Sequence, residues 1–298
     1  MNTQFSTIGL LGKEGDERVI RTLGTVAGHL ARRGFHVRVD TATALLLPDL
    51  DHQCLERDAL GRQCDLVVVI GGDGTMLNAA RSLASYDVPL VGINLGRLGF
   101  LTDIPREDVI SALDSILAGE YLSDRRCLLE AGIMHADGEG SVDVALNDAV
   151  IQKADGGRMI EFDTHVDGAY VCSHRADGLV VATPTGSTAY ALSGGGPILH
   201  PSLEAIALVP ICPHTLSDRP LALASDSVVE VVLRGREESQ AQLIWDGQRH
   251  AGLSWGDRVR IRKSVLSVTL LHPRDHDYFR ILRNKLHWGR SEHMDGTR

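Results

Sequence analysis

The most constraining feature of the chain is an apolar run that ends in a cluster of glycines. Residues 66–70 read Leu-Val-Val-Val-Ile, and residues 71–75 read Gly-Gly-Asp-Gly-Thr. Five apolar, mostly β-branched residues in a row are typical of a strand buried on both faces of a parallel sheet. Residues 76–83 then favour a helix. A strand, a glycine turn and a helix in this order bring backbone N–H groups and a helix N-terminus to the phosphates of a ligand.

The same glycines have a plainer interpretation, in which they form a tight turn and Asp73 caps the helix. That interpretation explains one or two glycines but not three around one carboxylate, so we favour a phosphate site. The chain contains neither Gly-x-x-x-x-Gly-Lys-Ser/Thr nor a clean Gly-x-Gly-x-x-Gly. A Walker-type phosphate loop is therefore excluded.

The pattern of apolar residues changes near Tyr121. Before it, expected strands (near 7–11, 35–39, 66–70 and 88–93) alternate with expected helices (16–33, 76–83 and one opened by Pro105). Residues 41–64 are vague and indicate at most a helix near 53–60. The alternation predicts a three-layer α/β domain with a parallel sheet over residues 1–122. Ligands bind such sheets at the carboxyl ends of strands, where residues 71–75 and the loop 94–101 fall.

Residues 123–274 show short runs with period-two alternation, which predict an all-β sandwich domain. Asp167-Gly168 and Asp177-Gly178 are hairpin turn signals between such runs. Residues 275–298 predict a closing C-terminal helix, through Tyr278, Ile281, Leu282 and Leu286, and a loose polar tail from Ser291 onward. We expect this helix to pack back on the first domain.

Charge and cysteine usage limit the compartment and the partners. The formal net charge of −9 argues against non-specific nucleic-acid binding, whose energy comes from neutralising phosphates. The five cysteines are scattered and never spaced Cys-x-x-Cys, which favours reduced thiols and no structural zinc site. No secretory signal pattern and no membrane-length apolar run is present, so we expect a cytoplasmic protein without membrane contact. His174, His200 and His214 fit no metal-ligand spacing.

A second unusual stretch follows a buried run at residues 179–182. Residues 183–190 read Thr-Pro-Thr-Gly-Ser-Thr-Ala-Tyr, and Ser193-Gly-Gly-Gly-Pro197 comes soon after. Hydroxyls and backbone N–H groups can bind a ribose, an amide or a phosphate, and Tyr190 adds a stacking surface. The alternative is a long turn whose Ser and Thr side chains satisfy its own backbone. The length of the stretch favours binding.

Together, the two stretches resemble the NAD kinase family of the bacterial type. Leu146-Asn147-Asp148, Gly195-Gly-Pro-Ile198, Pro210-Ile-Cys-Pro-His214 and Asp246-Gly-Gln248 resemble it as well, in order and with family-like spacing. The likeness covers nearly the whole chain, except residues 41–64 and the tail. The Gly-Gly-Asp-Gly-Thr element alone is less specific, because lipid kinases of the diacylglycerol and sphingosine type and phosphofructokinases resemble it there.

The resemblance implies transfer of the γ-phosphoryl group of ATP to the 2′-hydroxyl of the adenosine ribose of NAD, which gives NADP. It implies that Asp73 is the general base that takes the hydroxyl proton. It implies a divalent cation, Mg²⁺ by preference, held mainly by the ATP phosphates rather than by protein ligands. The residues that would present donors to phosphate are Gly71, Gly72, Gly74 and Thr75.

The resemblance also assigns residues to NAD by position. Asn147 and Asp148 match the pair that holds the adenosine half, and Phe100 matches a residue that lies against the adenine. Asp177 and Tyr190 match residues around the nicotinamide end. The other matches are Asp73, Gly74, Arg158, Arg175, Thr188, Ala189, Ala191, Leu192, Ser193 and Gln248.

Several of these residues have plainer alternatives that the sequence leaves open. Arg158 and Arg175 fit solvated turn arginines, Asp177 a hairpin cap, and Asn147-Asp148 an ordinary turn. For the whole chain, the alternatives are a lipid kinase and a catalytically silent NAD(P)-binding sensor. The low aromatic content, the acidic balance and the lack of a basic amphipathic helix disfavour the first. The intact glycine turn disfavours the second. Family members commonly form homodimers or homotetramers, and the resemblance implies a homo-oligomer.

Overall fold

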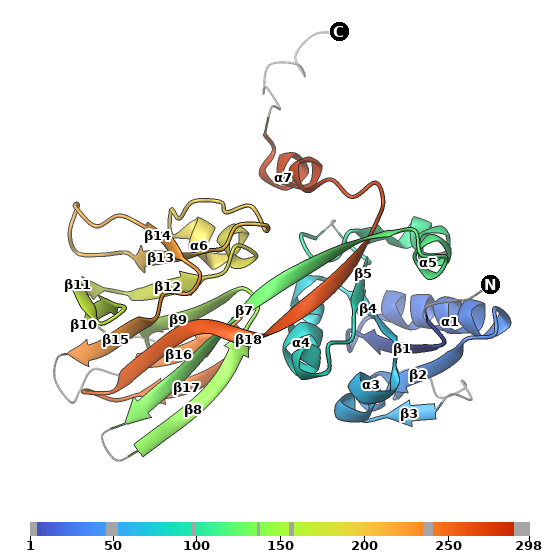
Figure 1. Cartoon of the computed structure of the whole chain (residues 1–298), viewed down its shortest axis with the longest axis horizontal. Coiled ribbons are helices and arrows are strands. Elements are labelled where there is room, and N and C mark those ends of the chain that lie inside the picture. The colour runs from blue at the N-terminus through green and yellow to red at the C-terminus, as the bar shows by residue number, and fades with distance from the viewer. Residues whose placement is uncertain are drawn as a thin grey trace, which may run out of the picture. The chain divides into compact units, whose positions relative to one another are not determined.

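The computed structural model describes residues 5–45, 53–96, 99–135, 138–154, 158–234 and 241–288. Within them, the chain forms two compact units (Figure 1). Unit 1 joins the segment up to Arg125 to the segment from Val268 onward, and unit 2 is Arg126–Ser267. Two strands, β7 (Tyr121–His135) and β18 (Arg258–Pro273), belong partly to each unit.

Unit 1 is built on a parallel sheet with the strand order β18-β5-β4-β1-β2-β3. Its strands are β1 (Thr7–Gly12), β2 (His36–Asp40), β3 (Gln53–Leu55), β4 (Leu66–Gly71) and β5 (Leu90–Asn94). Every residue of β4 and β5 is buried, as the apolar runs predict for central parallel strands. The last part of β18 pairs with β5 at Leu270 and Leu90, and the short β6 (Ile104–Pro105) pairs with the other end of β5.

Helices cover both faces of this sheet. Apolar side chains of α1 (Glu17–Arg32) and α5 (Val109–Leu117) share one core cluster with Val68 and Ile70 of β4. On the opposite face, Leu60 of α3 (Arg57–Gln63) and Val67 both approach Gly9. The remaining helices of unit 1 are α2 (Thr41–Ala44), α4 (Asp73–Leu83), α7 (Tyr278–Leu286) and the 3-10 turns Ala84–Tyr86 and Arg106–Asp108.

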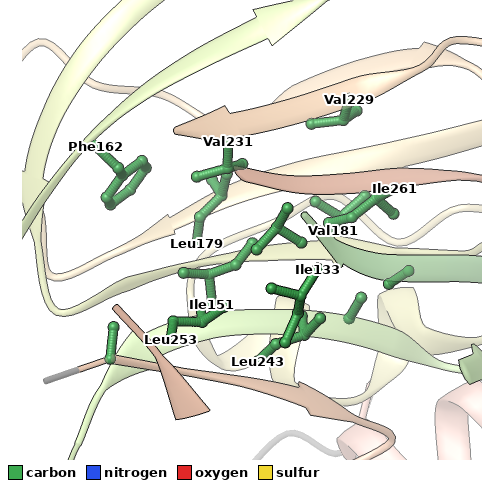
Figure 2. Packing of buried hydrophobic residues seen from close by; sticks show 14 of the residues in the cluster. Ile133, Ile151, Phe162, Leu179, Val181, Val229, Val231, Leu243, Leu253 and Ile261 are labelled. Atoms are coloured by element: carbon green, nitrogen blue, oxygen red, sulfur yellow. The ribbon is translucent and has the colours of Figure 1, made fainter. Parts of the chain in front are cut away.

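Unit 2 is a sandwich of antiparallel sheets. One contains β11 (Ala169–Ala176), β10 (Ile160–Val166), β15 (Val229–Arg234) and β18, with β7 and β8 (Gly138–Ala145) attached. The other runs β14 (Leu221–Ala224), β13 (Ala205–Ile211), β12 (Gly178–Ala182), β9 (Asp148–Lys153), β16 (Ala241–Trp245) and β17 (Arg249–Leu253). In Figure 2, Phe162, Val231 and Ile261 of the first sheet lie over Leu179, Val181 and Leu243 of the second.

These features confirm the predicted fold class of an α/β domain, a β-sandwich and a C-terminal helix. The Asp167-Gly168 hairpin is also confirmed, because both residues have positive φ and β10 pairs with β11. The Asp177-Gly178 hairpin is wrong, since β11 and β12 belong to different sheets and the chain crosses between them there. Residues 41–64, whose sequence indicates at most a helix near 53–60, contain β3 and then α3. The helix therefore starts later than expected. Pro105 ends β6 and is the N-cap of the 3-10 turn Arg106–Asp108, which leads directly into α5, so the helical segment opens there as expected.

The polar tail from Ser291 lies outside the described residues. Among the helices that are described, none has the length and apolar character needed to cross a membrane.

The sandwich core gives a direct test of the packing in unit 2. Leu243→Ala removes a side chain with 0% exposure from the apolar cluster, so it should lower the free energy of unfolding by about 2–5 kcal/mol. Val265→Ala, at a side chain that is 94% exposed in the same unit, should change it by about 0.5 kcal/mol or less. Urea denaturation followed by tryptophan fluorescence measures both. Equal effects would contradict this core.

Candidate active site

The glycine turn lies at the carboxyl edge of the parallel sheet. Parallel pairing sets Gly71 opposite Asn94 of β5, and Ile70 opposite Gly12 of β1. The chain segments that leave all three strands therefore start at the same edge of unit 1. Helix α4 begins at Asp73, and Gly72 is its N-cap in an extended conformation.

The carboxylate of Asp73 lies in the first turn of α4, and its described hydrogen bonds go to another segment of the chain. It accepts the backbone N–H groups of Phe100 at 2.9 Å, Leu101 at 3.1 Å and Thr102 at 3.2 Å, and the Thr102 hydroxyl at 3.1 Å. A Cβ on Gly99 would come within 2.0 Å of Asp73 Oδ1. The helix-capping alternative is therefore not what this side chain does, because its oxygens hold the following loop in place.

The glycines of the turn are needed for different reasons. A Cβ on Gly71 would lie 2.5 Å from Thr75 Oγ1, so packing within the turn requires glycine there. A Cβ on Gly72 would meet nothing within 4 Å, and its φ of −120° suits any residue. The fold itself does not explain Gly72, whereas a ligand that approaches the backbone closely would.

Two cavities of unit 1 open at this turn. One, of about 480 Å³, is lined by Gly72, Gly74 and Thr75 together with Lys13 and Arg57. The other, of about 360 Å³, is lined by Gly71, Gly72 and Asp73 together with Lys13, Arg18 and Lys285. The Lys285 ammonium also lies 6.0 Å from the centroid of the Phe100 ring. The cavity linings also include Glu14, Asp16, which pairs with Arg18 at 2.8 Å, and Asp40, which pairs with Arg57 at 2.9 Å. Basic side chains and a helix N-terminus thus lie beside Asp73, a combination suited to phosphate.

In unit 2, the Asn147-Asp148 pair is positioned by a residue 98–99 positions away in the sequence. The Asp246 carboxylate accepts the backbone N–H groups of Leu146 at 3.0 Å, Asn147 at 2.7 Å and Asp148 at 3.3 Å. Asp246 and Gly247 have positive φ and form the turn between β16 and β17, which places Gln248. The motif Asp246-Gly-Gln248 predicts a site role for Gln248 alone, whereas the structure adds Asp246. The Asp-Gly turn signal was the available hint to Asp246.

Asp148 itself is buried. Removal from water and the negative charge of Asp246 raise the pKa of its carboxyl group from 3.8 to about 7. Near neutral pH, Asp148 is thus partly protonated and can donate a hydrogen bond as well as accept one.

Tyr190 and Asp177 lie in the same neighbourhood. Burial raises the pKa of the Tyr190 phenol, and the negative charges of Cys212, Asp177 and Asp148 raise it further. Asp177 is ion-paired with Lys153 at 2.7 Å, and the Tyr190 side chain remains 41% exposed. Unit 2 therefore brings together Asp148, Asp177 and Tyr190, three residues that the family resemblance matches to one ligand.

The hydroxyl-rich stretch serves partly its own structure. The Thr183 hydroxyl donates to Leu146 O at 2.6 Å and accepts from Gly186 N. The Ser187 hydroxyl donates to Pro184 O and accepts from Leu199 N. Both side chains are fully buried. These two residues therefore fit the alternative in which the Ser and Thr side chains satisfy the backbone of their own turn. Gly186 is required there, because a Cβ would come within 2.1 Å of Asn147 O.

The other predicted NAD residues differ in exposure. Ser193, Arg158, Arg175 and Gln248 are exposed, and Arg175 lies 3.8 Å from Glu161. Thr188, Ala189, Leu192 and Asn147 are half-buried. Ala191, in the short helix α6 (Tyr190–Ser193), has 0% exposure and packs in an apolar cluster with Val180 and Val209. Its methyl group anchors the loop and faces no open surface.

The three histidines considered above have separate surroundings. His174 contacts Asp218 at 3.0 Å and Cys172 at 2.9 Å, His200 contacts Ser202, and His214 is exposed. The structure thus does not group them as metal ligands.

Comparison with known proteins shows to which family the chain belongs. Residues 8–121 match the family model of the ATP-NAD kinase N-terminal domain, and residues 146–272 match that of the ATP-NAD kinase C-terminal domain. The chain belongs to the NAD kinase family. It is 46% identical over 288 residues to the NAD kinase of Nitrosospira multiformis, covering 97% of both chains. It is 47% identical over 290 residues to that of Nitrosococcus oceani, covering 97% of this chain and 99% of that protein.

Solved structures agree. An NAD kinase from Archaeoglobus fulgidus in complex with ATP is 26% identical, with a TM-score of 0.73 over 94% of this chain and 98% of that chain. Yeast NADH kinase complexed with NADH has the same fold, with a TM-score of 0.89 at 24% identity over 98% and 93% of the two chains. These findings confirm the predicted family, fold class and enzyme class, and they support neither the lipid kinase nor the silent sensor.

The raised pKa of Asp148 predicts a pH-dependent stability. Between 3.8 and about 7 the folded state binds this proton more strongly than the unfolded state, so stability falls as pH rises through that window. Asp148→Asn removes the effect. The variant should gain stability over the wild type from about pH 4 to pH 7, by at most about 4 kcal/mol, and hold that gain above pH 7.

Urea denaturation from pH 4.5 to pH 8.5 measures this difference. The exposed Asp226 provides the control, and the difference between Asp226→Asn and the wild type should not follow the same course. A difference for Asp148→Asn that stays constant over the range would argue against a buried neutral carboxyl group.

Proposed function

We propose that this chain transfers the γ-phosphoryl group of ATP to the 2′-hydroxyl of the adenosine ribose of NAD, with Asp73 as the general base. The observation that carries the proposal is the Asp73 carboxylate, fixed by four hydrogen bonds beside the cavities of the glycine turn. The family membership and the ATP complex of the A. fulgidus relative support the choice of substrates.

The hydrogen bonds leave the carboxylate able to act as a base. Oδ1 accepts from Leu101 N, Thr102 N and the Thr102 hydroxyl, whereas Oδ2 accepts only from Phe100 N among the bonds described. A carboxylate offers about four acceptor positions, so Oδ2 keeps capacity for the ribose hydroxyl. Such a base takes the hydroxyl proton as the bond to phosphorus forms. Its fixed position also aligns the acceptor, and positioning supplies much of the rate in phosphoryl transfer.

For the phosphates of ATP, we propose the backbone of Gly71, Gly72 and Gly74, the Thr75 hydroxyl and the basic rim of the two cavities. A divalent cation, Mg²⁺ by preference, neutralises phosphate charge in such reactions. The cavity carboxylate of Asp40 is ion-paired with Arg57 at 2.9 Å. That pairing fits an ion held mainly by the phosphates.

For NAD, we propose that Asn147 and the partly protonated Asp148 hold the adenosine half and that Phe100 lies against the adenine. Asp177 and Tyr190 would contact the nicotinamide end, with Lys153 setting the position of Asp177. Thr188, Ala189, Leu192 and Ser193 would line the pocket, and Arg158, Arg175 and Gln248 would contribute from its exposed rim. We further propose that the protein works in the cytoplasm as a homodimer or homotetramer.

The direct test is the reaction itself. Purified protein is incubated with ATP, Mg²⁺ and NAD, and NADP is measured with a dehydrogenase specific for that product. Parallel reactions replace NAD by NADH, ATP by polyphosphate, and NAD by diacylglycerol or sphingosine in vesicles. NADP formation supports the proposal. Phosphorylation of the lipid without NADP would overturn it.

Asp73→Asn tests the base. The amide lacks a basic oxygen and places an NH₂ group where the loop N–H groups donate, so kcat should fall at least about 100-fold. Thr102→Val is the matched control, since it removes one bond to Asp73 but keeps the carboxylate. Its kcat should fall much less, and it should keep the wild-type dependence of rate on pH. Near-wild-type kcat in Asp73→Asn would remove this residue from the chemistry.

Gly72→Ala tests close approach of ATP. The added methyl meets no protein atom within 4 Å, so the protein should fold normally while kcat/KM for ATP falls roughly 10- to 100-fold. Gly24→Ala, inside α1 and also free of clashes, is the control. That variant should be slightly more stable and keep the wild-type kcat/KM. Equal kcat/KM for both variants would place ATP elsewhere.

A further inference from the structure

Two histidines and one aspartate of unit 1 converge next to the loop that holds Asp73, because Asp103 directly follows Thr102. Asp103 precedes β6, His272 lies near the end of β18, and His276 lies just before α7. Asp103 Oδ2 lies 2.9 Å from His272 Nδ1 and 2.5 Å from His276 Nδ1. The two imidazole rings stack with centroids 4.0 Å apart. One ligand atom from each residue lies within 4.8 Å of the others.

This cluster is buried and has unused polar atoms. The side chains of His272 and Asp103 are 2% and 6% exposed. Asp103 Oδ1 and His272 Nε2 have no hydrogen-bond partner. A buried polar atom without a partner costs about 1–3 kcal/mol, so its presence calls for an explanation.

We propose that Asp103, His272 and His276 bind a divalent transition-metal ion of the zinc class. Two imidazole nitrogens and one carboxylate oxygen are ligands that Zn²⁺ takes, whereas Mg²⁺ prefers oxygen. Zn–N and Zn–O distances near 2.0–2.2 Å require ligand atoms somewhat more than 3 Å apart in a tetrahedron. The distances from Asp103 Oδ2 to Nδ1 of His272 and of His276 need to widen by less than about 1 Å to admit the ion. The site is distinct from the cation carried by ATP.

A second carboxylate, from a fourth residue, occupies the position of an outer partner. Asp124 Oδ2 lies 3.8 Å from His272 Nε2, on the side of the ring away from Asp103. Metal-bound histidines usually direct their second ring nitrogen at such a carboxylate, which orients the ring and strengthens the ligand. A cluster held by hydrogen bonds alone leaves Asp103 Oδ1 unexplained, whereas a metal would give that oxygen a contact.

The cluster has an access route and a fourth coordination position. Asp103 and His276 line a cavity of about 680 Å³, together with residues of α5 and α7. His276 is the more accessible of the two histidines, with 12% side-chain exposure. Water from the cavity can complete a four-coordinate ion. The ion would tie the C-terminal segment of unit 1 to the chain before β6.

The test is metal binding by the full-length protein. The protein is stripped with a chelator and titrated with Zn²⁺ against a chromophoric competitor, without nucleotide or Mg²⁺. We expect one equivalent to bind the wild type, and Co²⁺ to give the visible absorption of a four-coordinate site. His276→Ala and Asp103→Asn should each weaken Zn²⁺ binding at least about 100-fold, and Asp124→Asn about 10- to 100-fold. Zn²⁺ should raise the Tm of the wild type but not that of His276→Ala or Asp103→Asn.

His36→Ala, at an exposed histidine of unit 1, is the control and should bind Zn²⁺ like the wild type. A wild type that binds no Zn²⁺, or folded His276→Ala and Asp103→Asn proteins that bind it unchanged, would overturn the proposal. If neither variant folds, X-ray absorption of the zinc-loaded wild type decides. Two imidazole ligands and no sulfur support the site, and sulfur ligands would refute it.

Discussion

The pairing of β4 between β1 and β5 is the constraint on which unit 1 depends. All three strands are parallel and almost entirely buried, so their register cannot slip without exposing apolar side chains. That register brings the segment after Gly12, the turn after Gly71 and the loop after Asn94 to one edge. Asp73 lies in the turn after Gly71 and binds the loop after Asn94, because its carboxylate accepts the backbone N–H groups of residues 100–102. The order and register of the strands therefore bring the parts of the candidate phosphate site together.

Two aspartates of the candidate site have the same side chain but lie in different surroundings, which suit them to different roles. Asp73 lines a cavity, and its oxygens accept hydrogen bonds from the backbone of residues 100–102. Asp148 is buried near a second negative charge, which favours the neutral form. One group suits accepting a proton from a hydroxyl, and the other suits donating a hydrogen bond to a ligand. Residue type alone does not distinguish them.

Local patterns in the sequence were enough for the strand and turn at residues 66–75, because burial on both faces and glycine content are encoded there. They were also enough for the change from α/β to β near Tyr121. They failed where the deciding partner is distant. Nothing near Asn147 indicates that Asp246 holds it, and nothing near Asp177 indicates that the next strand joins another sheet. The same holds for His272 and His276, whose partner Asp103 lies well over a hundred residues earlier.

Unit 1 is assembled from two stretches of chain separated by the whole of unit 2, and this has a consequence for synthesis. As the chain leaves the ribosome, β5 has an open edge at Leu90 until Leu270 of β18 emerges and pairs with it. Unit 2 is contiguous and complete before that moment. An open edge of an apolar parallel sheet is a template for pairing with other chains. The time during which a nascent molecule is exposed to aggregation is therefore set by how long the ribosome takes to translate the inserted sandwich.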